Sequence, residues 1–237
     1  YNPDRTEVEN DGRVITDQRL VNNHCSKFNH PPALQPRHRE VARETLWWQE
    51  QFPGLDVLYA KKDVKAAFKL LWLESESVGV FAVELPGEPF GLPGKTITVF
   101  ALVLTFGWAG SPGEYQLLAT VAKLYHQSFR PNQEEWHTTV PFSSKFLVDD
   151  QLLQEPLLGT RPWQSARVAG RGVRKASGNA AENLEKDAEE GQFEVEKLIW
   201  GILFSSVDRT VTLPTVKLIK ALHVLNDPRL DPGCTLI

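Results

Sequence analysis

The chain of 237 residues is 41% hydrophobic and 24% charged, the composition of a globular protein with a buried core. Its formal net charge of −4 argues against a protein that coats nucleic acid with its whole surface, although a local basic groove is compatible with it. No apolar run reaches the roughly 18 residues of a membrane span, so no membrane partner is expected.

The cysteines bear on the cellular compartment of the protein, and the first residue bears on whether the sequence is a piece of a longer chain. Cys25 and Cys234 lie near opposite ends, which is not a disulfide framework and is typical of a reducing, intracellular compartment, either cytoplasm or nucleus. His24, His30 and His38 lie near Cys25, but their spacing fits no standard zinc pattern. Because methionine is absent even at position 1, we expect a piece of a longer chain.

The first half of the chain predicts short strands and helices joined by irregular segments. Residues 13–22 are expected to form a strand that runs into a polar turn, and residues 39–51 have the apolar spacing of a helix. Residues 55–63 are typical of a strand whose last residue is Asp63. Residues 64–72 are expected to form a helix with an apolar face.

The rest of the chain predicts more strands and several helices. Residues 78–85 and 96–106 are strand candidates, and residues 117–129 have helical spacing. Ser111 as N-cap and Pro112 at the first helical position are the usual signal for the start of this helix. The later elements are a strand–turn–strand over 145–153, a helical segment over 162–190, strands over 196–204 and 209–213, and a helix over 215–225. Strands joined as hairpins and interspersed with helices indicate the α+β class.

Carboxylates lie at two strand ends. Asp149 and Asp150 are adjacent in the 145–153 turn, where a solvated turn is the ordinary interpretation, and Asp63 would be explained equally well as a helix N-cap. If the two strands are neighbours in one antiparallel sheet, however, the three carboxylates converge at one edge. Their oxygens suit Mg²⁺ or Mn²⁺, and two such ions about 3.5–4 Å apart stabilise both the attacking and the leaving oxygen of a phosphoryl transfer.

A basic stripe lies on the helical segment 162–190. Its members follow helical spacing at i, i+4, i+7 and i+8: Arg167, Arg171, Arg174 and Lys175. Such a stripe can follow a phosphate backbone. The alternative, which the sequence by itself favours, is a solvated face whose cations pair with nearby glutamates.

A series of short blocks also runs through the chain in a definite order. The blocks are Arg13-x3-Asp17-x-Arg19-x2-Asn22, Asp63-x4-Phe68, Leu104-x-Phe106-Gly107-x3-Ser111-Pro112-x2-Tyr115, Leu147-Val148-Asp149-Asp150, Asn183-x2-Lys186, Leu198-x-Trp200-Gly201 and Leu213-Pro214-x2-Lys217. The ordered set resembles the reverse transcriptase domain of retroelements and covers nearly the whole chain. Each block is weak alone, whereas their order is specific.

The resemblance implies an RNA-directed DNA polymerase, a nucleotidyltransferase that adds dNTPs to a primer 3′-OH on an RNA or DNA template. The fold it implies is an α+β palm, an antiparallel sheet backed by helices in a ferredoxin-like or RRM-like arrangement. The implied parts are partial fingers (1–50), palm (51–77), a fingers insertion (78–111), palm (112–212) and the start of the thumb (213–237). The missing fingers, thumb and RNase H regions would belong to the full polyprotein.

The resemblance also implies roles for individual residues. The catalytic residues would be Asp63, Asp149 and Asp150, which with the Val64 backbone would hold two Mg²⁺ ions, or Mn²⁺. The nucleotide would contact Arg13, Val64, Phe68, Phe106, Gly107 and Lys186. Of these, Phe68 would exclude a 2′-hydroxyl by a clash, and Lys186 would stabilise charge or donate a proton. The primer–template would contact Leu147, Ser111, Pro112, Trp200 and Gly201.

Two departures from the family's pattern keep other functions open. Leu147 stands where the family usually has an aromatic residue, and Phe106 stands where it often has glutamine. One alternative is therefore an inactive retroelement remnant that keeps the fold and binds nucleic acid or protein. Another is a metal-dependent nuclease, which would require a further carboxylate or histidine beside the three aspartates.

Overall fold

The computed structural model describes residues 17–132 and 139–226, and the chain divides into two compact units. The first unit comprises Tyr1–Ala33 and Ala66–Leu117, and the second comprises Leu34–Lys65 and Leu118–Ile237. The boundaries expected for fingers, palm and thumb stay predictions.

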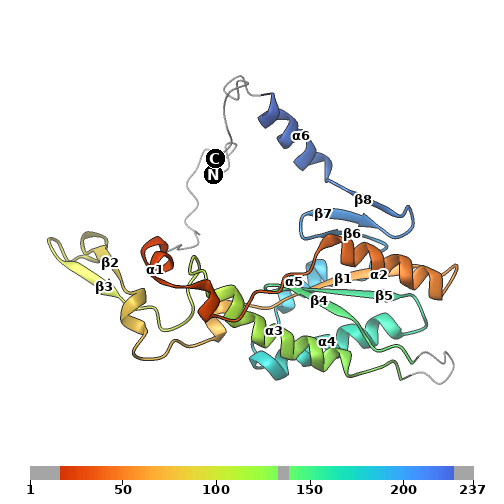
Figure 1. Ribbon diagram of the computed structural model, residues 1–237, viewed down its shortest axis with the longest axis horizontal. Coiled ribbons are helices and arrows are strands. Elements are labelled where there is room, and N and C mark those ends of the chain that lie inside the picture. Colours follow the sequence, from red (N-terminus) through yellow and green to blue (C-terminus); the bar gives the residue numbers. More distant parts are fainter. Residues whose placement is uncertain (1–16, 133–138, 227–237) are drawn as a thin grey trace. The chain divides into compact units, whose positions relative to one another are not determined.

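The described residues form an α+β fold (Figure 1), as the sequence predicts. The helices are α1 (Arg19–His24), α2 (His38–Gln51), α3 (Ser111–Gln127), α4 (Arg161–Ser177), α5 (Leu184–Glu190) and α6 (Thr215–Leu225). The strands are β1 (Val57–Asp63), β2 (Val83–Pro86), β3 (Thr96–Val99), β4 (Ser144–Leu147), β5 (Asp150–Pro156), β6 (Glu196–Ile199), β7 (Ile202–Ser205) and β8 (Thr210–Thr212). None of the helices in the described ranges is long and apolar enough to cross a membrane.

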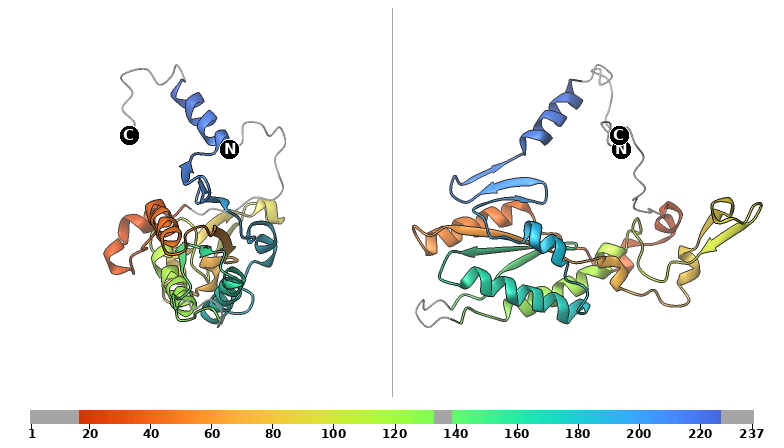
Figure 2. Two further views of the ribbon diagram at one scale, coloured as in Figure 1. Left: turned by 90° about the vertical axis from the view of Figure 1, so that its right-hand side faces the viewer. Right: turned by 180° about the vertical axis from the view of Figure 1, so that it is seen from behind.

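The second unit is built on an antiparallel sheet with the strand order β1-β5-β4. Because successive side chains of a strand point to opposite faces, Leu152 packs with Val41 of α2 and Leu153 with Ala169 of α4. Helix α2 therefore covers one face of the sheet, and α4 covers the other (Figures 1 and 2). The central strand β5 is buried on both faces, although it also contains three buried polar residues: Gln151, Gln154 and Glu155.

A buried ion pair fixes the end of β5 to the start of α4. Glu155 and Arg161 are both fully buried and form a salt bridge, and the Ser165 hydroxyl donates to Glu155 at 2.8 Å. The Arg161 guanidinium also donates to the backbone carbonyls of Val140 and Pro141, each at 2.9 Å. Burial raises the pKa of Glu155 to about 7, against the lowering effect of Arg161. The pair positions α4, since either charge alone would be buried without a partner.

His126 of α3 joins this polar cluster. Its ring nitrogens hydrogen-bond with the hydroxyls of Ser144, at 3.1 Å, and Ser165, at 3.0 Å. Burial lowers the pKa of His126 to about 4, because the charged ring would lose its hydration. His126 is therefore neutral in the folded protein at neutral pH and links α3, β4 and α4.

The second unit also contains a sheet with the strand order β6-β7-β8, which packs against α2. The sequence predicts one strand over 196–204, but the chain turns at Trp200 and Gly201, whose φ angles are +45° and +86°. Positive φ at both central residues is typical of a type I′ hairpin turn, and the glycine adopts it without strain. The prediction of a single strand is therefore wrong, whereas the helix expected over 215–225 is confirmed as α6.

Several local predictions in and next to the first unit are wrong for identifiable reasons. The strand and turn expected over 13–22 are replaced at residues 19–22 by helix α1. The Asp17 carboxylate accepts the Arg19 backbone N–H at 3.0 Å just before this helix. The helix expected over 64–72 is reduced to a 3₁₀ turn at Ala67–Leu70, because Ala66 has φ of +53° and breaks the helical path.

The strand expected over 78–85 begins as a 3₁₀ turn at Val78–Phe81 and becomes the β2 strand only at Val83. The strand expected over 96–106 ends at Val99. Beyond it, the segment leaves β2 and pairs instead with residues 71–73, through Leu73 N–H to Leu102 O at 2.9 Å and Leu104 N–H to Leu71 O at 3.0 Å. Pairing with a third segment, which the strand pattern does not reveal, therefore ends β3 early.

We predict that His126→Gln makes folding stability less sensitive to acid. The folded-state pKa of His126 is depressed to about 4 from 6.5, so its contribution is present above pH 6.5 and is lost as pH falls toward 4. At pH 5 this loss corresponds to about 2 kcal/mol. Urea unfolding of the unmodified protein and of His126→Gln at pH 7 and pH 5 measures the change in the free energy of unfolding. Glu155, whose pKa is shifted in the opposite direction, is present in both proteins, so its contribution cancels in the comparison. An equal change in both proteins would contradict the assignment.

Candidate active site

The register of β1 on β5 brings the predicted carboxylates to one end of the sheet. Asp63, the last residue of β1, is the direct partner of Asp150, the first residue of β5. Asp149 occupies the β4–β5 turn, and its backbone carbonyl accepts the Val64 N–H at 3.1 Å. The expectation that the two strands are neighbours is confirmed, and it places all three aspartates at the same edge.

The Asp63 carboxylate is held by two side chains, one from the residue directly before α5 and one from within α5. Its carboxylate accepts the Asn183 amide at 2.7 Å and the Lys186 ammonium at 2.6 Å. The backbone of the same segment pairs with β1, through Lys65 N–H to Ala181 O at 2.8 Å and Asn183 N–H to Asp63 O at 3.2 Å. The N-cap explanation of Asp63 is therefore wrong, since no helix starts at Val64 and its carboxylate serves other donors.

Asn183 also sets the start of α5. Asn183 is the N-cap residue of this helix, and its side-chain oxygen accepts the Lys186 backbone N–H at 3.4 Å. One amide thus orients both the helix that carries Lys186 and the carboxylate that Lys186 binds. The sequence signal was the block Asn183-x2-Lys186, but the family resemblance assigned a role only to the lysine.

A second ion-pair cluster fixes this segment to β1 from the other side. Glu182 accepts Lys62 at 2.9 Å and also pairs with Arg174 of α4. Asp187 of α5 pairs with Lys62 as well. Gly170 makes room for this cluster, because a Cβ there would lie 2.2 Å from Glu182 Oε1. No local sequence pattern indicates that Lys62, Glu182 and Gly170 lie together, since their proximity depends on tertiary contacts.

The charges at the sheet end shift the pKa values of Asp150 and Lys186. Burial raises the pKa of Asp150, and the carboxylates of Asp149 and Asp63 raise it further, whereas the Lys61 and Lys186 ammonium groups lower it. The hydrogen bond to Asp63 raises the pKa of Lys186. Like charges directly opposite each other destabilise a strand pair. The site therefore favours additional positive charge next to Asp150.

The β4–β5 turn has an unusual backbone. Val148 has φ of +55°, a conformation that costs about 1–3 kcal/mol and that β-branched residues rarely adopt. Its N–H donates to the Gln35 side chain at 3.2 Å, which helps to hold the turn. Strained residues of this kind concentrate at functional sites, and this one lies directly before Asp149.

The donor set at the sheet end suits a hard divalent cation. Three carboxylates supply oxygen ligands, and each oxygen of Asp63 keeps a second lone pair beyond its bond to Asn183 or Lys186. The Val64 N–H is taken up by Asp149, so the carbonyl is the backbone group through which Val64 could act. Within residues 17–132 and 139–226, however, no three His, Cys, Asp or Glu side chains form a ready-made metal site. The carboxylates would have to close around an ion.

Other predicted site residues gather within the first unit. The ring of Phe68 lies 5.0 Å from Phe106 and 6.2 Å from Tyr115, between ring centroids. Phe68 is buried, so this packing alone accounts for its aromatic side chain. Helix α3 starts within one residue of the predicted position, but Ser111 is its first residue instead of its N-cap, and the Ser111 hydroxyl donates to the Thr105 carbonyl at 2.7 Å.

Asn22 holds the loop that contains Gly107. Its amide donates to the Gly107 carbonyl and accepts the Ala109 N–H, both at 2.8 Å. This contact joins two of the blocks that carry the family resemblance, which assigned Asn22 no role. Arg13 lies outside the described residues, so its expected contact with the nucleotide stays a prediction.

The residues expected at the primer lie in the second unit. Leu147 ends β4, directly before the strained turn. Trp200 and Gly201 form the β6–β7 turn, where the His38 ring hydrogen-bonds to the Trp200 carbonyl at 3.4 Å and Lys217 donates to the Gly201 carbonyl at 3.0 Å. Their predicted contacts with primer and template remain predictions.

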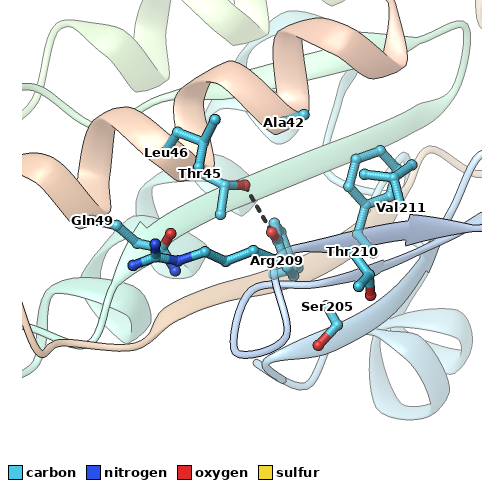
Figure 3. A pocket seen from close by; sticks show the side chains of 10 residues that line it. Ala42, Thr45, Leu46, Gln49, Ser205, Arg209, Thr210 and Val211 are labelled. Carbon is cyan, nitrogen blue, oxygen red and sulfur yellow. Dashed lines mark hydrogen bonds between the residues drawn. The ribbon is translucent and has the colours of Figure 1, made fainter.

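A small cavity lies between α2 and the β7–β8 hairpin (Figure 3). Thr45 and Tyr59 form a 2.7 Å hydrogen bond in its wall, and the Arg209 side chain lies near Gln49. Its volume is about 70 Å³, room for two or three waters at about 30 Å³ each. The cavity is too small for a nucleotide and does not contain the three aspartates.

Comparisons with models of protein families and with curated proteins found no match. Among solved structures, a telomerase from Candida albicans in complex with a fragment of telomeric RNA is similar, with 13% identity and a TM-score of 0.43. The similarity covers 81% of this chain and 39% of that one, so this chain spans well under half of that protein's length. A similarity at this level carries no information on activity.

We predict that Asn183→Ala lowers the free energy of unfolding by about 1–3 kcal/mol, because it removes both the α5 cap and a donor to Asp63. Urea denaturation followed by circular dichroism measures the change. The matched control is Asn179→Ala at an exposed position nearby, expected to change stability by less than about 0.5 kcal/mol. Equal effects of the two substitutions would show that Asn183 does not hold the site together.

Proposed function

We propose that this chain is a reverse transcriptase-like nucleotidyltransferase of retroelement origin that adds dNTPs to a primer 3′-OH on an RNA or DNA template. The observation that carries the proposal is the pairing of Asp63 with Asp150, with Asp149 in the strained turn beside them. The ordered sequence blocks support the same assignment, because they place these aspartates in the family's metal-binding positions.

The proposed cofactor is two Mg²⁺ ions, or Mn²⁺, held by Asp63, Asp149 and Asp150 with the Val64 carbonyl. Bound there, the ions supply Lewis-acid stabilisation of the attacking and leaving oxygens. Burial is the main cause that raises the pKa of Asp150, and the carboxylates of Asp149 and Asp63 raise it further; the charge of the ions would oppose both effects. The three aspartates thus have an electrostatic reason to bind cations.

Lys186 is the proposed cation for the triphosphate. Its ammonium lies 2.6 Å from Asp63 and is nearly half exposed, so it is both oriented by the carboxylate and accessible to solvent. A lysine in this position can stabilise charge on a leaving pyrophosphate or donate a proton to it. Proposed contacts of Arg13, Phe68, Phe106 and Gly107 with the nucleotide rest on the family resemblance.

A catalytically silent binding module is the second candidate function. It is favoured by the occupation of both Asp63 oxygens by Asn183 and Lys186, and by the lack of a ready-made three-ligand group among the described residues. Leu147, in place of an aromatic residue, points the same way. The two functions differ in whether the protein extends a primer.

We predict that the purified protein extends a labelled DNA primer on RNA and DNA templates with Mg²⁺ or Mn²⁺. Asp149→Asn should reduce extension by at least about 100-fold, since it removes a metal-binding carboxylate. Asp56→Asn, an exposed aspartate before the other end of β1, is the control and should retain full extension. Extension that survives Asp149→Asn contradicts the proposal, and no extension by the unmodified protein favours the binding module.

A further inference from the structure

The helices on the face of the sheet opposite α2 carry several cations, of which Arg161 and Arg174 pair with Glu155 and Glu182 from outside the two helices. Residues 118–132 and 161–179, which include most of α3 and all of α4, contain seven lysines or arginines and no aspartate or glutamate. The whole chain has a net charge of −4, so the charge is strongly segregated. The two helices lie side by side in the second unit (Figure 1), where a Cβ at Gly172 would lie 2.8 Å from the Ala122 carbonyl oxygen.

Most of the basic stripe lacks ion pairs in the described part of the chain. Of its four cations, only Arg174 forms one there, with Glu182. Arg167, Arg171 and Lys175 are exposed, and no acidic partner for them occurs among the described residues. Within residues 17–132 and 139–226, the interpretation of the stripe as a face neutralised by glutamates is therefore confirmed for Arg174 alone.

The same cations line two open hollows on this surface. One, of about 390 Å³, is lined by Phe129, Arg130, Arg167 and Arg171, among others. The second, of about 520 Å³, is lined by Tyr125, Arg171, Arg174 and Lys175 together with Asn179. Arg171 lines both, so the two hollows are adjacent, and we name them together the α3–α4 groove.

Accessible aromatic rings lie beside the groove, at Trp163, and in its lining, at Phe129 and Tyr125. Trp163 is 56% exposed and lies four residues before Arg167, hence on the same side of α4. Phe129 is 38% exposed, and its ring centroid lies 5.0 Å from that of Tyr125. Cationic grooves with aromatic platforms bind single-stranded nucleic acid, because bases stack on the rings while phosphates contact the cations.

The spacing of the cations matches a strand of this kind. Arg167, Arg171 and Lys175 are four residues apart, a rise of about 6 Å per step and about 12 Å in all. Phosphates follow one another by roughly 3.4 Å along the axis of one stacked strand, so the stripe spans three to four of them. An anionic membrane would instead favour a flat basic surface without hollows, and these cations line a groove.

We infer that the α3–α4 groove binds a single strand of RNA or DNA, at a surface separate from the three aspartates. Alternation along β5 places Asp150 on the α2 side with Leu152, whereas α4 packs on the opposite side with Leu153. The groove thus gives the protein a second contact with nucleic acid, which does not require catalysis or metal ions.

The test is fluorescence anisotropy of a labelled 20-nucleotide oligo(dT) or oligo(U) with the whole protein, in EDTA and over a range of salt. Arg167→Gln with Arg171→Gln should weaken binding by about 10-fold or more and reduce the slope of log K against log salt by about 1.4, at 0.7 per phosphate. Trp163→Ala should weaken binding by about 10-fold and leave the slope unchanged, since it removes stacking and no charge.

The matched control is Arg39→Gln with Arg43→Gln, two exposed arginines with the same spacing on α2. It should change the affinity by less than about 2-fold, because it alters net charge equally but lies on the other side of the sheet. Thermal melts verify that each variant is folded. Equal effects of the two double substitutions, or a loss confined to binding of phosphatidylserine vesicles, would overturn the inference.

The result is independent of the proposed polymerase activity. Asp63→Asn should leave the difference between the groove variant and its α2 control unchanged, because metal ligands do not take part. Groove-dependent binding in a protein that fails to extend primers would therefore support the groove and contradict the polymerase. Extension without groove-dependent binding would do the reverse.

Discussion

The candidate site depends on two carboxylates that face each other across neighbouring strands. Asp63 and Asp150 are direct partners in the β1–β5 ladder, where their repulsion opposes the pairing that the sheet requires. Lys186 and Asn183 offset part of it by binding Asp63, and both come from the segment that pairs with the outer edge of β1. The segment that carries Asn183 and Lys186 thus both covers the outer edge of β1 and balances the negative charge of Asp63.

The sheet and the ends of its strands could be predicted from the sequence. The apolar runs around Asp149 and before Asp63 predict β1, β4 and β5, because buried strands require such runs, and helical spacing predicts α2 and α6. The backbone at Val148, with positive φ, could not be predicted, since a β-branched residue favours extended conformations. The apolar pattern over 196–204 does not reveal the turn at Trp200, although Gly201 is a local signal for it.

Contacts between distant segments were the least predictable part of the site. The link from Asn183 to Asp63 joins residues 120 positions apart and depends on how α5 packs on β1. The buried pair of Glu155 and Arg161 likewise has no local signature, because both residue types are usually exposed. The basic stripe was visible in the sequence, but its partners were not, and the structure assigns an ion pair to Arg174 among the described residues.

The central claim is that Asp63, Asp149 and Asp150 bind divalent cations together. Electron paramagnetic resonance of free Mn²⁺ during a titration measures this directly, without nucleotide or primer. We expect saturable binding by the unmodified protein and by Asp56→Asn, and a loss of affinity of about 10-fold or more in Asp63→Asn and Asp150→Asn. Equal Mn²⁺ binding by all four proteins would contradict the account, because the cations would then be held elsewhere.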